Sequence, residues 1–147
     1  MARENYRQLG GGAYKALREM SRFVHEASLE AGLVHLVFLR VSQLNGCAYC
    51  VDAHTQEALA AGEAPQRLYD LTVWRETPFF SERERAALAW AEAMTRLPGG
   101  PPPEGLHDET RRHFSEQEFV DLTLAIATIN ALNRVGIGFG AQPARRT

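Results

Sequence analysis

The sequence predicts an all-α protein, a compact bundle of about six to seven helices. Three observations lead to this fold class. Apolar residues recur at three- and four-residue steps, two Ser-x-x-Glu capping boxes precede apolar runs, and glycine or proline separates the periodic segments. A length of 147 residues suits one hydrophobic core, so we expect residues 1–147 to form a single domain.

The first half of the chain contains two expected helices. Residues 13–31 place Leu17, Met20 and Val24 on one face, and Gly32 supplies a stop. The next segment, LVHLVFLRVSQL (residues 33–44), is apolar almost all round. Its Val and Phe residues also suit a buried strand, but its length and the Asn45-Gly46 breaker favour a buried helix.

The remaining helices follow from their start and stop signals. A short helix over residues 51–62 ends at a glycine, and Pro65 opens another that continues to Trp74. A capping box of Ser81 and Glu84 begins the helix over residues 81–97. A stiff PGGPPP loop follows, and Ser115 with Glu118 forms the second box, before the apolar run of residues 119–140.

Composition and charge narrow the function classes. A net charge of −2 gives no positive field for nucleic acid or an anionic membrane surface. The first residues contain no apolar stretch typical of a secretory signal, and no segment has the uninterrupted apolar length of a membrane span. We therefore expect a cytoplasmic protein with no nucleic-acid or membrane partner, in which cysteines stay reduced.

Two segments, residues 33–44 and 119–140, are apolar on nearly every side. Such helices need cover on every side, which a small bundle has difficulty supplying. Self-association would provide this cover, although both helices could also run through the middle of the monomer. We expect a homo-oligomer.

The stretch NGCAYCVDAHT contains both cysteines of the chain. If Cys47 opens a helix, then Cys47, Cys50 and His54 occupy positions i, i+3 and i+7 and lie along one stripe. The free N–H groups of a first helical turn favour a thiolate, and a nearby imidazole can accept the thiol proton. This geometry predicts that Cys50, nearer His54, attacks an oxidant and that Cys47 resolves the product as a disulfide.

Two other interpretations of this stripe stay open. Cys47, Cys50, His54 and His35 could bind zinc, although three ligands would then come from one helix and the sequence has no second CxxC or HxxxH. The cysteines could also simply be small buried side chains. His35, within an apolar run, equally suits a core position.

The segment RVSQLNGCAYCVDAHTQEA closely resembles the core motif of the AhpD-like alkylhydroperoxidases, in the carboxymuconolactone decarboxylase superfamily. The similarity is densest over residues 33–62 and extends into the segments around WRETPFFSERERAALAWAEAMT and INALNRVGIGF. The resemblance implies an all-helical fold assembled as trimers or hexamers. It also implies thiol-dependent reduction of hydroperoxides, with electrons from a dithiol donor such as a lipoyl-bearing protein. We expect no metal and no other cofactor.

The family's functional residues correspond to Cys47, Cys50 and His54, with the second cysteine reacting with peroxide. The family also uses a glutamate twelve residues before the first cysteine, and here that position holds His35. An imidazole can move a proton but cannot stabilise an imidazolium as a carboxylate does. Glu57, on the same stripe, is a candidate substitute, or else a solvated surface carboxylate.

Alternative functions are a general disulfide oxidoreductase, a decarboxylase of the carboxymuconolactone type, and an oligomeric zinc-binding module. The other histidines, His25, His107 and His113, have no spacing that converges on Cys50, so we expect them at the surface or against a partner. Arg40 and Arg134 lie on apolar segments and should need carboxylate partners, which a subunit contact could supply.

Overall fold

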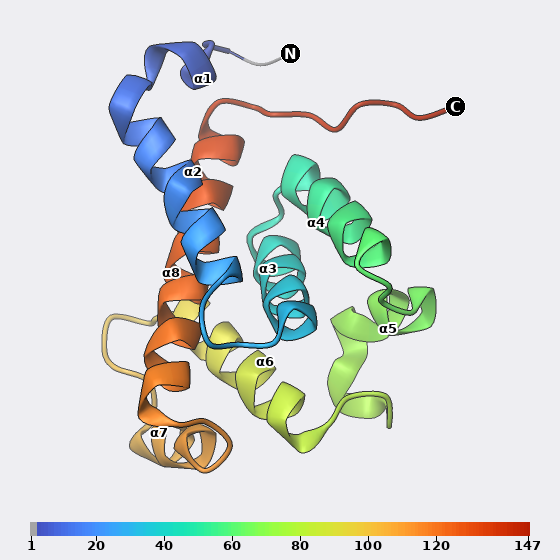
Figure 1. The fold of residues 1–147 in the computed structure, drawn as a ribbon, viewed down its shortest axis with the longest axis vertical. Coiled ribbons are helices and arrows are strands. Elements are labelled where there is room, and N and C mark those ends of the chain that lie inside the picture. The colour runs from blue at the N-terminus through green and yellow to red at the C-terminus, as the bar shows by residue number, and fades with distance from the viewer. Residues whose placement is uncertain (1–2) are drawn as a thin grey trace.

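A computed structural model describes residues 3–147, and every regular element in that range is a helix (Figure 1). The elements are α1 (Tyr6–Leu9), α2 (Gly11–His25), α3 (Ala31–Asn45), α4 (Ala48–Ala60), α5 (Pro65–Asp70), the 3-10 helix η1 (Leu71–Glu76), α6 (Glu82–Thr95), α7 (Glu104–Arg111) and α8 (Glu116–Gly138). The expected all-α class is confirmed. The segment from Pro65 to Trp74 divides into α5 and η1, and the short polar helix α7 was not expected from the sequence.

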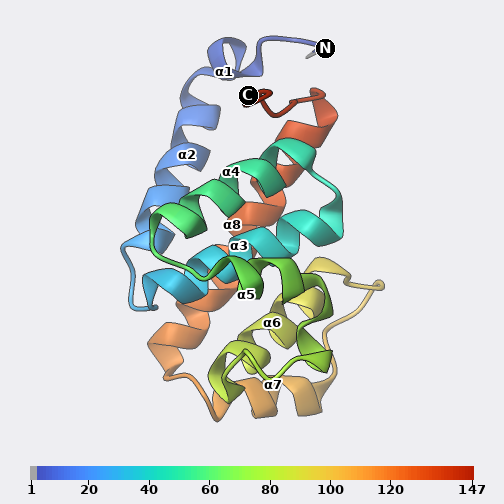
Figure 2. The same cartoon turned by 90° about the vertical axis from the view of Figure 1, so that its right-hand side faces the viewer.

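Helix α3 passes through the middle of the molecule and packs against α4, α6 and α8 (Figure 2). Its buried side chains occur on all its faces: Leu33, Val34, Leu36, Val37, Phe38, Leu39, Val41 and Ser42. Residues 33–44 are thus a buried helix, as expected, rather than a strand. Because neighbouring helices of the same chain cover α3, this helix needs no partner subunit.

Helix α8 is the second apolar segment, and it is only partly covered. Val120, Leu124 and Ile137 remain exposed, while α2, α3 and α6 pack against other parts of the helix. By length and composition α8 could cross a membrane, a test that the core helix of a folded bundle also passes. Asp121, Asn133 and Arg134 interrupt the apolar residues of this helix, so α8 is not an uninterrupted apolar span, as expected, and the homo-oligomer remains a prediction.

The first long helix ends earlier than its periodicity predicts. Helix α2 stops at His25, and Gly32, expected as the stop, lies in the first turn of α3. The reason is a tertiary contact: the hydroxyl of Ser28 donates to Oδ2 of Asp121 on α8 at 2.6 Å, and Leu29 is buried beside it. The chain between α2 and α3 is therefore held against α8, which a periodicity argument cannot detect.

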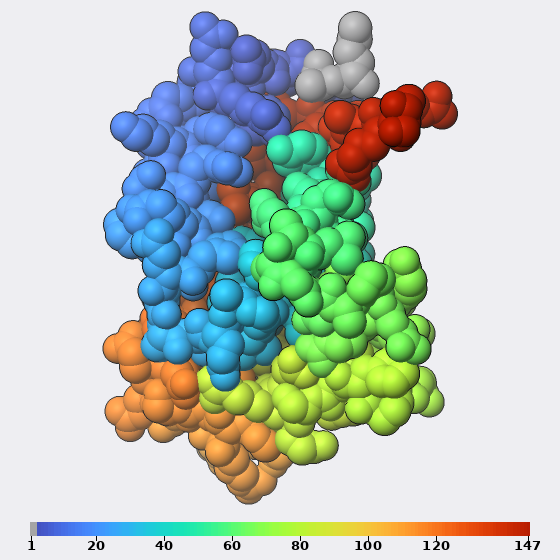
Figure 3. Space-filling view, turned by 45° about the vertical axis from the view of Figure 1, so that its right-hand side comes forward, coloured from blue at the N-terminus to red at the C-terminus, as the bar shows by residue number. Residues whose placement is uncertain are grey.

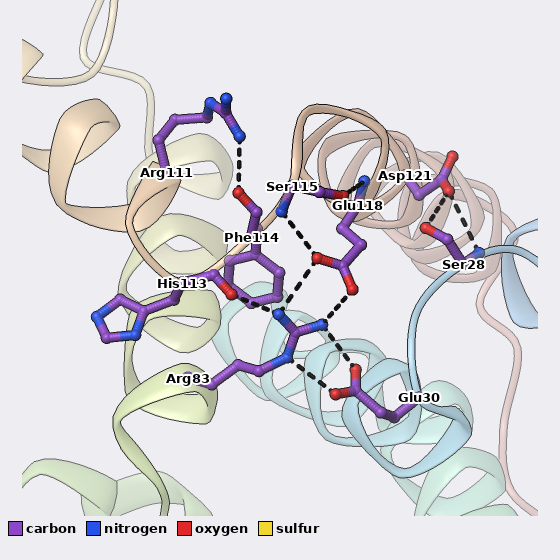
Figure 4. A network of polar contacts seen from close by, with 9 residues as sticks. All are labelled: Ser28, Glu30, Arg83, Arg111, His113, Phe114, Ser115, Glu118 and Asp121. Atoms are coloured by element: carbon purple, nitrogen blue, oxygen red, sulfur yellow. Dashed lines mark hydrogen bonds and ion pairs between the residues drawn. The ribbon is translucent and has the colours of Figure 1, made fainter.

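Both capping boxes form as expected, and a single arginine joins the helices that they begin (Figure 4). Arg83, in the first turn of α6, donates through Nε to Glu30 at 2.9 Å and through Nη2 to Glu118 at 2.9 Å. It also donates to the carbonyl of His113. Since Glu30 precedes α3 and Glu118 lies in the first turn of α8, Arg83 fixes three helix starts relative to one another.

Arg40 finds its carboxylate within the chain rather than across a subunit contact. Its guanidinium lies 2.8 Å from Glu92 of α6, which also accepts hydrogen bonds from the indole of Trp74 and from Arg75. Burial opposes ionisation of Glu92, but the hydrogen bonds from Trp74, Arg75 and Arg40 outweigh it and lower the pKa of the carboxyl. Arg134 instead donates to Asn130, one turn earlier on α8.

Candidate active site

The turn between α3 and α4 places the first cysteine. Gly46 has a φ of 72°, a left-handed conformation that ends α3 and that glycine adopts without a side-chain clash. The amide of Cys47 donates to the carbonyl of Ser42 at 3.1 Å, which completes the turn. Cys47 then stands at the N-cap of α4, so the Asn-Gly breaker predicts this boundary correctly.

Cys47 and Cys50 form a disulfide, with both residues buried. The backbone N–H of Cys50 donates to Sγ of Cys47 at 3.3 Å, so the Cys47 sulfur caps the N-terminus of α4. The side chain of Cys50 lies one turn along α4. The N-terminus of α4 therefore stabilises the Cys47 sulfur, whereas His54 is the neighbour of Cys50. The sequence alone did not separate these two effects.

Helix α8 closes the inner side of the disulfide. A Cβ atom added at Gly136 would lie 3.2 Å from Sγ of Cys47 and 3.5 Å from Sγ of Cys50, so the helix backbone packs directly on the two sulfurs. One turn earlier, buried Asn133 donates to the hydroxyl of Ser42 at 3.0 Å and accepts from Asn45 at 3.0 Å. These amide contacts hold α8 against the end of α3, just before the cysteines.

On the outer side, Cys50 opens into a cavity of about 380 Å³ between α2, α4 and α8. Figure 3 shows the corresponding hollow between the blue segment of α2 and the green segment of α4, with α8 at its floor. The lining residues are Tyr6, Tyr14, Arg18, Ser21, Arg22, His25, His35, Tyr49, Cys50, Ala53, His54, Glu57, Leu132, Val135 and Gly136. Cys50, and not Cys47, is thus the cysteine that a small molecule in this cavity could contact.

His54 and Glu57 form a hydrogen-bonded pair on the wall of this cavity. Nδ1 of His54 lies 2.8 Å from Oε2 of Glu57, and because a carboxylate only accepts, Nδ1 carries the proton. The neutral ring then has its lone pair on Nε2. This hydrogen bond, opposed by partial burial, lowers the pKa of Glu57, which keeps the carboxylate ionised at neutral pH. Glu57 is half-exposed, yet it is not a free surface carboxylate.

His35 also lines the cavity, beside a residue that the sequence argument placed elsewhere. The rings of His25 and His35 lie 5.3 Å apart, and the ring of Phe38 makes T-shaped contacts with both His25 and His54. His25 therefore belongs to the cavity and not to a remote surface, which corrects the sequence-based expectation. Its position at the end of α2 reaches this cavity only through the packing of α2 on α8, and no spacing in the sequence signals that contact.

The five expected site residues thus share one region. Cys50, His54, His35 and Glu57 line the cavity, and Cys47 lies behind Cys50 through the disulfide. His107 and His113 lie away from it, as expected: His107 packs against Trp90 and Phe119, and His113 lies next to Glu109. In the disulfide state neither sulfur is available to a metal, so the zinc set that includes both cysteines does not describe this form.

Comparison with known proteins identifies the family. The model of the carboxymuconolactone decarboxylase family matches residues 11–93. The uncharacterized protein YdfG of Bacillus subtilis is 37% identical over 144 residues, which are 98% of each chain.

Solved structures agree with this family. The Agrobacterium tumefaciens protein ATU0492, of unknown function and proposed as an antioxidant defence protein AhpD, is 38% identical with a TM-score of 0.95, over 99% of this chain and 100% of its own. An uncharacterized peroxidase-related protein of Silicibacter is 25% identical with a TM-score of 0.79, over 88% of this chain and 69% of its own. The chain therefore belongs to the carboxymuconolactone decarboxylase family and has an AhpD-like fold.

Proposed function

We propose that this protein is a thiol-dependent oxidoreductase that reduces hydroperoxides through a dithiol–disulfide cycle of Cys47 and Cys50. The observation that carries the proposal is the position of the Cys47–Cys50 disulfide, with Cys50 at the wall of a cavity that His54 and Glu57 also line. The described form is the oxidised end of this cycle. The antioxidant-defence role proposed for ATU0492 supports the same class of activity.

The oxidative half begins with the reduced pair. Nε2 of His54 accepts the proton of the Cys50 thiol, and the ionised Glu57 stabilises the resulting imidazolium through Nδ1. The thiolate attacks the outer oxygen of the hydroperoxide, the O–O bond breaks, and the leaving alkoxide takes the proton of the His54 imidazolium and departs as an alcohol. Cys50 is then a sulfenic acid. The thiol of Cys47 attacks its sulfur, and water leaves as the disulfide forms.

The reductive half depends on the hydrogen bond from the N–H of Cys50 to the Cys47 sulfur. A thiolate of the external dithiol attacks the accessible sulfur, Cys50, and Cys47 leaves as a thiolate. Thiol–disulfide exchange is faster when the leaving thiolate is more stable, and the N–H of Cys50 points at the Cys47 sulfur. The second thiol of the donor then releases Cys50 and closes its own disulfide. The family resemblance favours a lipoyl-bearing protein as the donor, and the same resemblance favours assembly as a trimer or hexamer.

Steady-state consumption of cumene hydroperoxide, with dihydrolipoamide as the electron donor, tests the proposal. The wild-type protein should turn over, and Cys50→Ser should lose all peroxide consumption. Cys47→Ser should react once and stop, with a sulfenic acid that a dimedone probe labels on Cys50. Turnover that persists in Cys50→Ser, or equal loss of the first reaction in both variants, would contradict the assigned roles.

A second candidate function uses the same pair on protein or small-molecule disulfides instead of peroxides. The hydrogen bond that the Cys47 sulfur accepts favours this second function, because a stable leaving thiolate assists disulfide exchange with any substrate. The two functions separate in one comparison. Fast reduction of a disulfide such as oxidised lipoamide by the reduced protein, with no acceleration of peroxide loss, would select the disulfide oxidoreductase.

A further inference from the structure

Three metal-ligating side chains from three helices meet inside the cavity, beside the disulfide and without using it. His25 comes from the end of α2, His35 from α3 and Glu57 from α4, and one ligand atom of each lies within 4.8 Å of the other two. Two imidazoles and one carboxylate on one side of an open cavity form the donor set of three-ligand sites for Zn²⁺ or Fe²⁺. We propose that His25, His35 and Glu57 bind a divalent transition-metal ion.

The hydrogen bonds around His25 leave a nitrogen free to bind the ion. Nδ1 of His25 lies 2.7 Å from the carbonyl of Ser21, and because a carbonyl only accepts, Nδ1 carries the proton. The lone pair of the neutral ring is therefore on Nε2. A backbone carbonyl that fixes the orientation of a histidine through its other nitrogen is the usual support of a metal ligand.

One ring nitrogen of His35 is not used by any hydrogen bond among the described residues. This Nδ1 atom is buried and has no hydrogen-bond partner among the described residues. Burying a polar atom without a partner ordinarily costs free energy. A ring nitrogen without a hydrogen-bond partner can bind a metal ion through its lone pair.

Glu57 can serve the metal and His54 together. The hydrogen bond from His54 uses Oε2, which leaves Oε1 available. Two atoms bound tetrahedrally to Zn²⁺ at roughly 2.1 Å lie about 3.4 Å apart, so the three ligands must close by an ångström or so. The half-exposed side chain of Glu57 has the freedom for this movement. The ion would then share the cavity with Cys50, with its remaining positions open to water or a substrate oxygen.

The test uses the oxidised protein, in which the disulfide removes both thiols as ligands. Purified protein is stripped with a chelator, and Zn²⁺ binding is measured by isothermal titration calorimetry. We expect one Zn²⁺ per chain. His35→Ala and His25→Ala should lose this stoichiometric binding, and Glu57→Gln should weaken it at least tenfold. His113→Ala, which removes a histidine away from the cavity, should bind as the wild type does.

Co²⁺ provides a second, spectroscopic measurement that does not depend on a calorimetric signal. Visible d–d absorption without a thiolate-to-cobalt charge-transfer band should appear in the wild type and in a Cys47→Ser, Cys50→Ser double variant. Circular dichroism checks that each variant is folded, and His35→Gln replaces the alanine variant if that one unfolds. Absence of stoichiometric binding to the oxidised protein, or binding that needs the cysteines or survives in both histidine variants, would overturn the proposal. None of these results depends on peroxide turnover.

Discussion

Nδ1 of His54 donates a 2.8 Å hydrogen bond to the carboxylate of Glu57, one turn along α4. The contact gives His54 the tautomer with a free Nε2 and places an ionised carboxylate behind the ring. The family resemblance puts a glutamate at position 35, on another helix, and this chain has His35 there. In the proposed mechanism, Glu57 provides from α4 itself the negative charge that position 35 lacks.

Replacement of this carboxylate should slow the thiol chemistry without unfolding the protein. Glu57→Gln preserves the size of the side chain but removes the charge that stabilises the His54 imidazolium. We expect the rate of Cys50 oxidation by peroxide at neutral pH to fall by about 10- to 100-fold. Rapid-mixing kinetics of the reduced protein measures this rate. Asp52→Asn is the control. It removes another carboxylate of α4, one paired with Arg146, and should react at the wild-type rate.

The contact between α8 and the disulfide predicts a second effect, on stability. In Gly136→Ala the new methyl group would press on Sγ of Cys47, which the disulfide prevents from moving away. We expect the free energy of unfolding of the oxidised protein to fall by about 1–3 kcal/mol, the usual range for an overpacked site. Urea unfolding followed by circular dichroism measures it.

Gly138→Ala is the matched control for that substitution. It lies two residues further along α8, and an added Cβ there meets no atom within 4 Å. Replacing glycine by alanine in a helix stabilises it by about 0.5–1 kcal/mol, so this variant should be equal to or slightly more stable than the wild type. Equal stability of the two variants would show that Gly136 does not pack on the sulfurs as described.

His35 predicts the sign of part of the pH dependence of stability. Burial, and then the charge of His25, lowers its pKa from the ordinary value of 6.5. The unfolded chain therefore binds a proton at a higher pH than the folded chain, and stability falls as the pH drops below about 6.5, down to the folded pKa. In His35→Gln the decline in this window should be smaller. Urea unfolding of both proteins at a series of pH values checks this, and an unchanged slope in His35→Gln would contradict it.

Replacement of Glu92 should destabilise the folded protein strongly. It is buried and accepts from Arg40, Arg75 and Trp74, so Glu92→Leu leaves the buried guanidinium of Arg40 without a counter-charge. The free energy of unfolding should fall by about 3–5 kcal/mol. Glu19→Leu, which removes a solvent-exposed pair with Arg22, should change stability by less than about 1 kcal/mol. A small effect at Glu92 would mean that water or another acid replaces it.

The sequence predicted the local features well because each depends on a few neighbouring residues. The capping boxes of Ser81 and Ser115 start their helices by side-chain-to-backbone hydrogen bonds three residues apart, and Gly46 ends α3 by its own conformation. The alignment of Cys50 with His54 follows in the same way from helical spacing.

The features that the sequence did not predict depend on contacts between distant segments. Helix α2 ends at His25 because Ser28 hydrogen-bonds to Asp121, which is 93 residues away. His25 enters the cavity because α2 packs on α8, and Gly136 meets the disulfide through the same packing. Helical periodicity describes one helix at a time and contains no information on which helices meet.

The most direct test of the central claim is a single-turnover reaction of the fully reduced protein with one equivalent of hydroperoxide. Mass spectrometry and thiol titration follow the products. The account predicts that both thiols disappear together as the Cys47–Cys50 disulfide forms, and that Cys50 alone becomes a sulfenic acid in Cys47→Ser. Thiols that survive the peroxide, or a sulfenic acid that forms on Cys47 instead of Cys50, would contradict it.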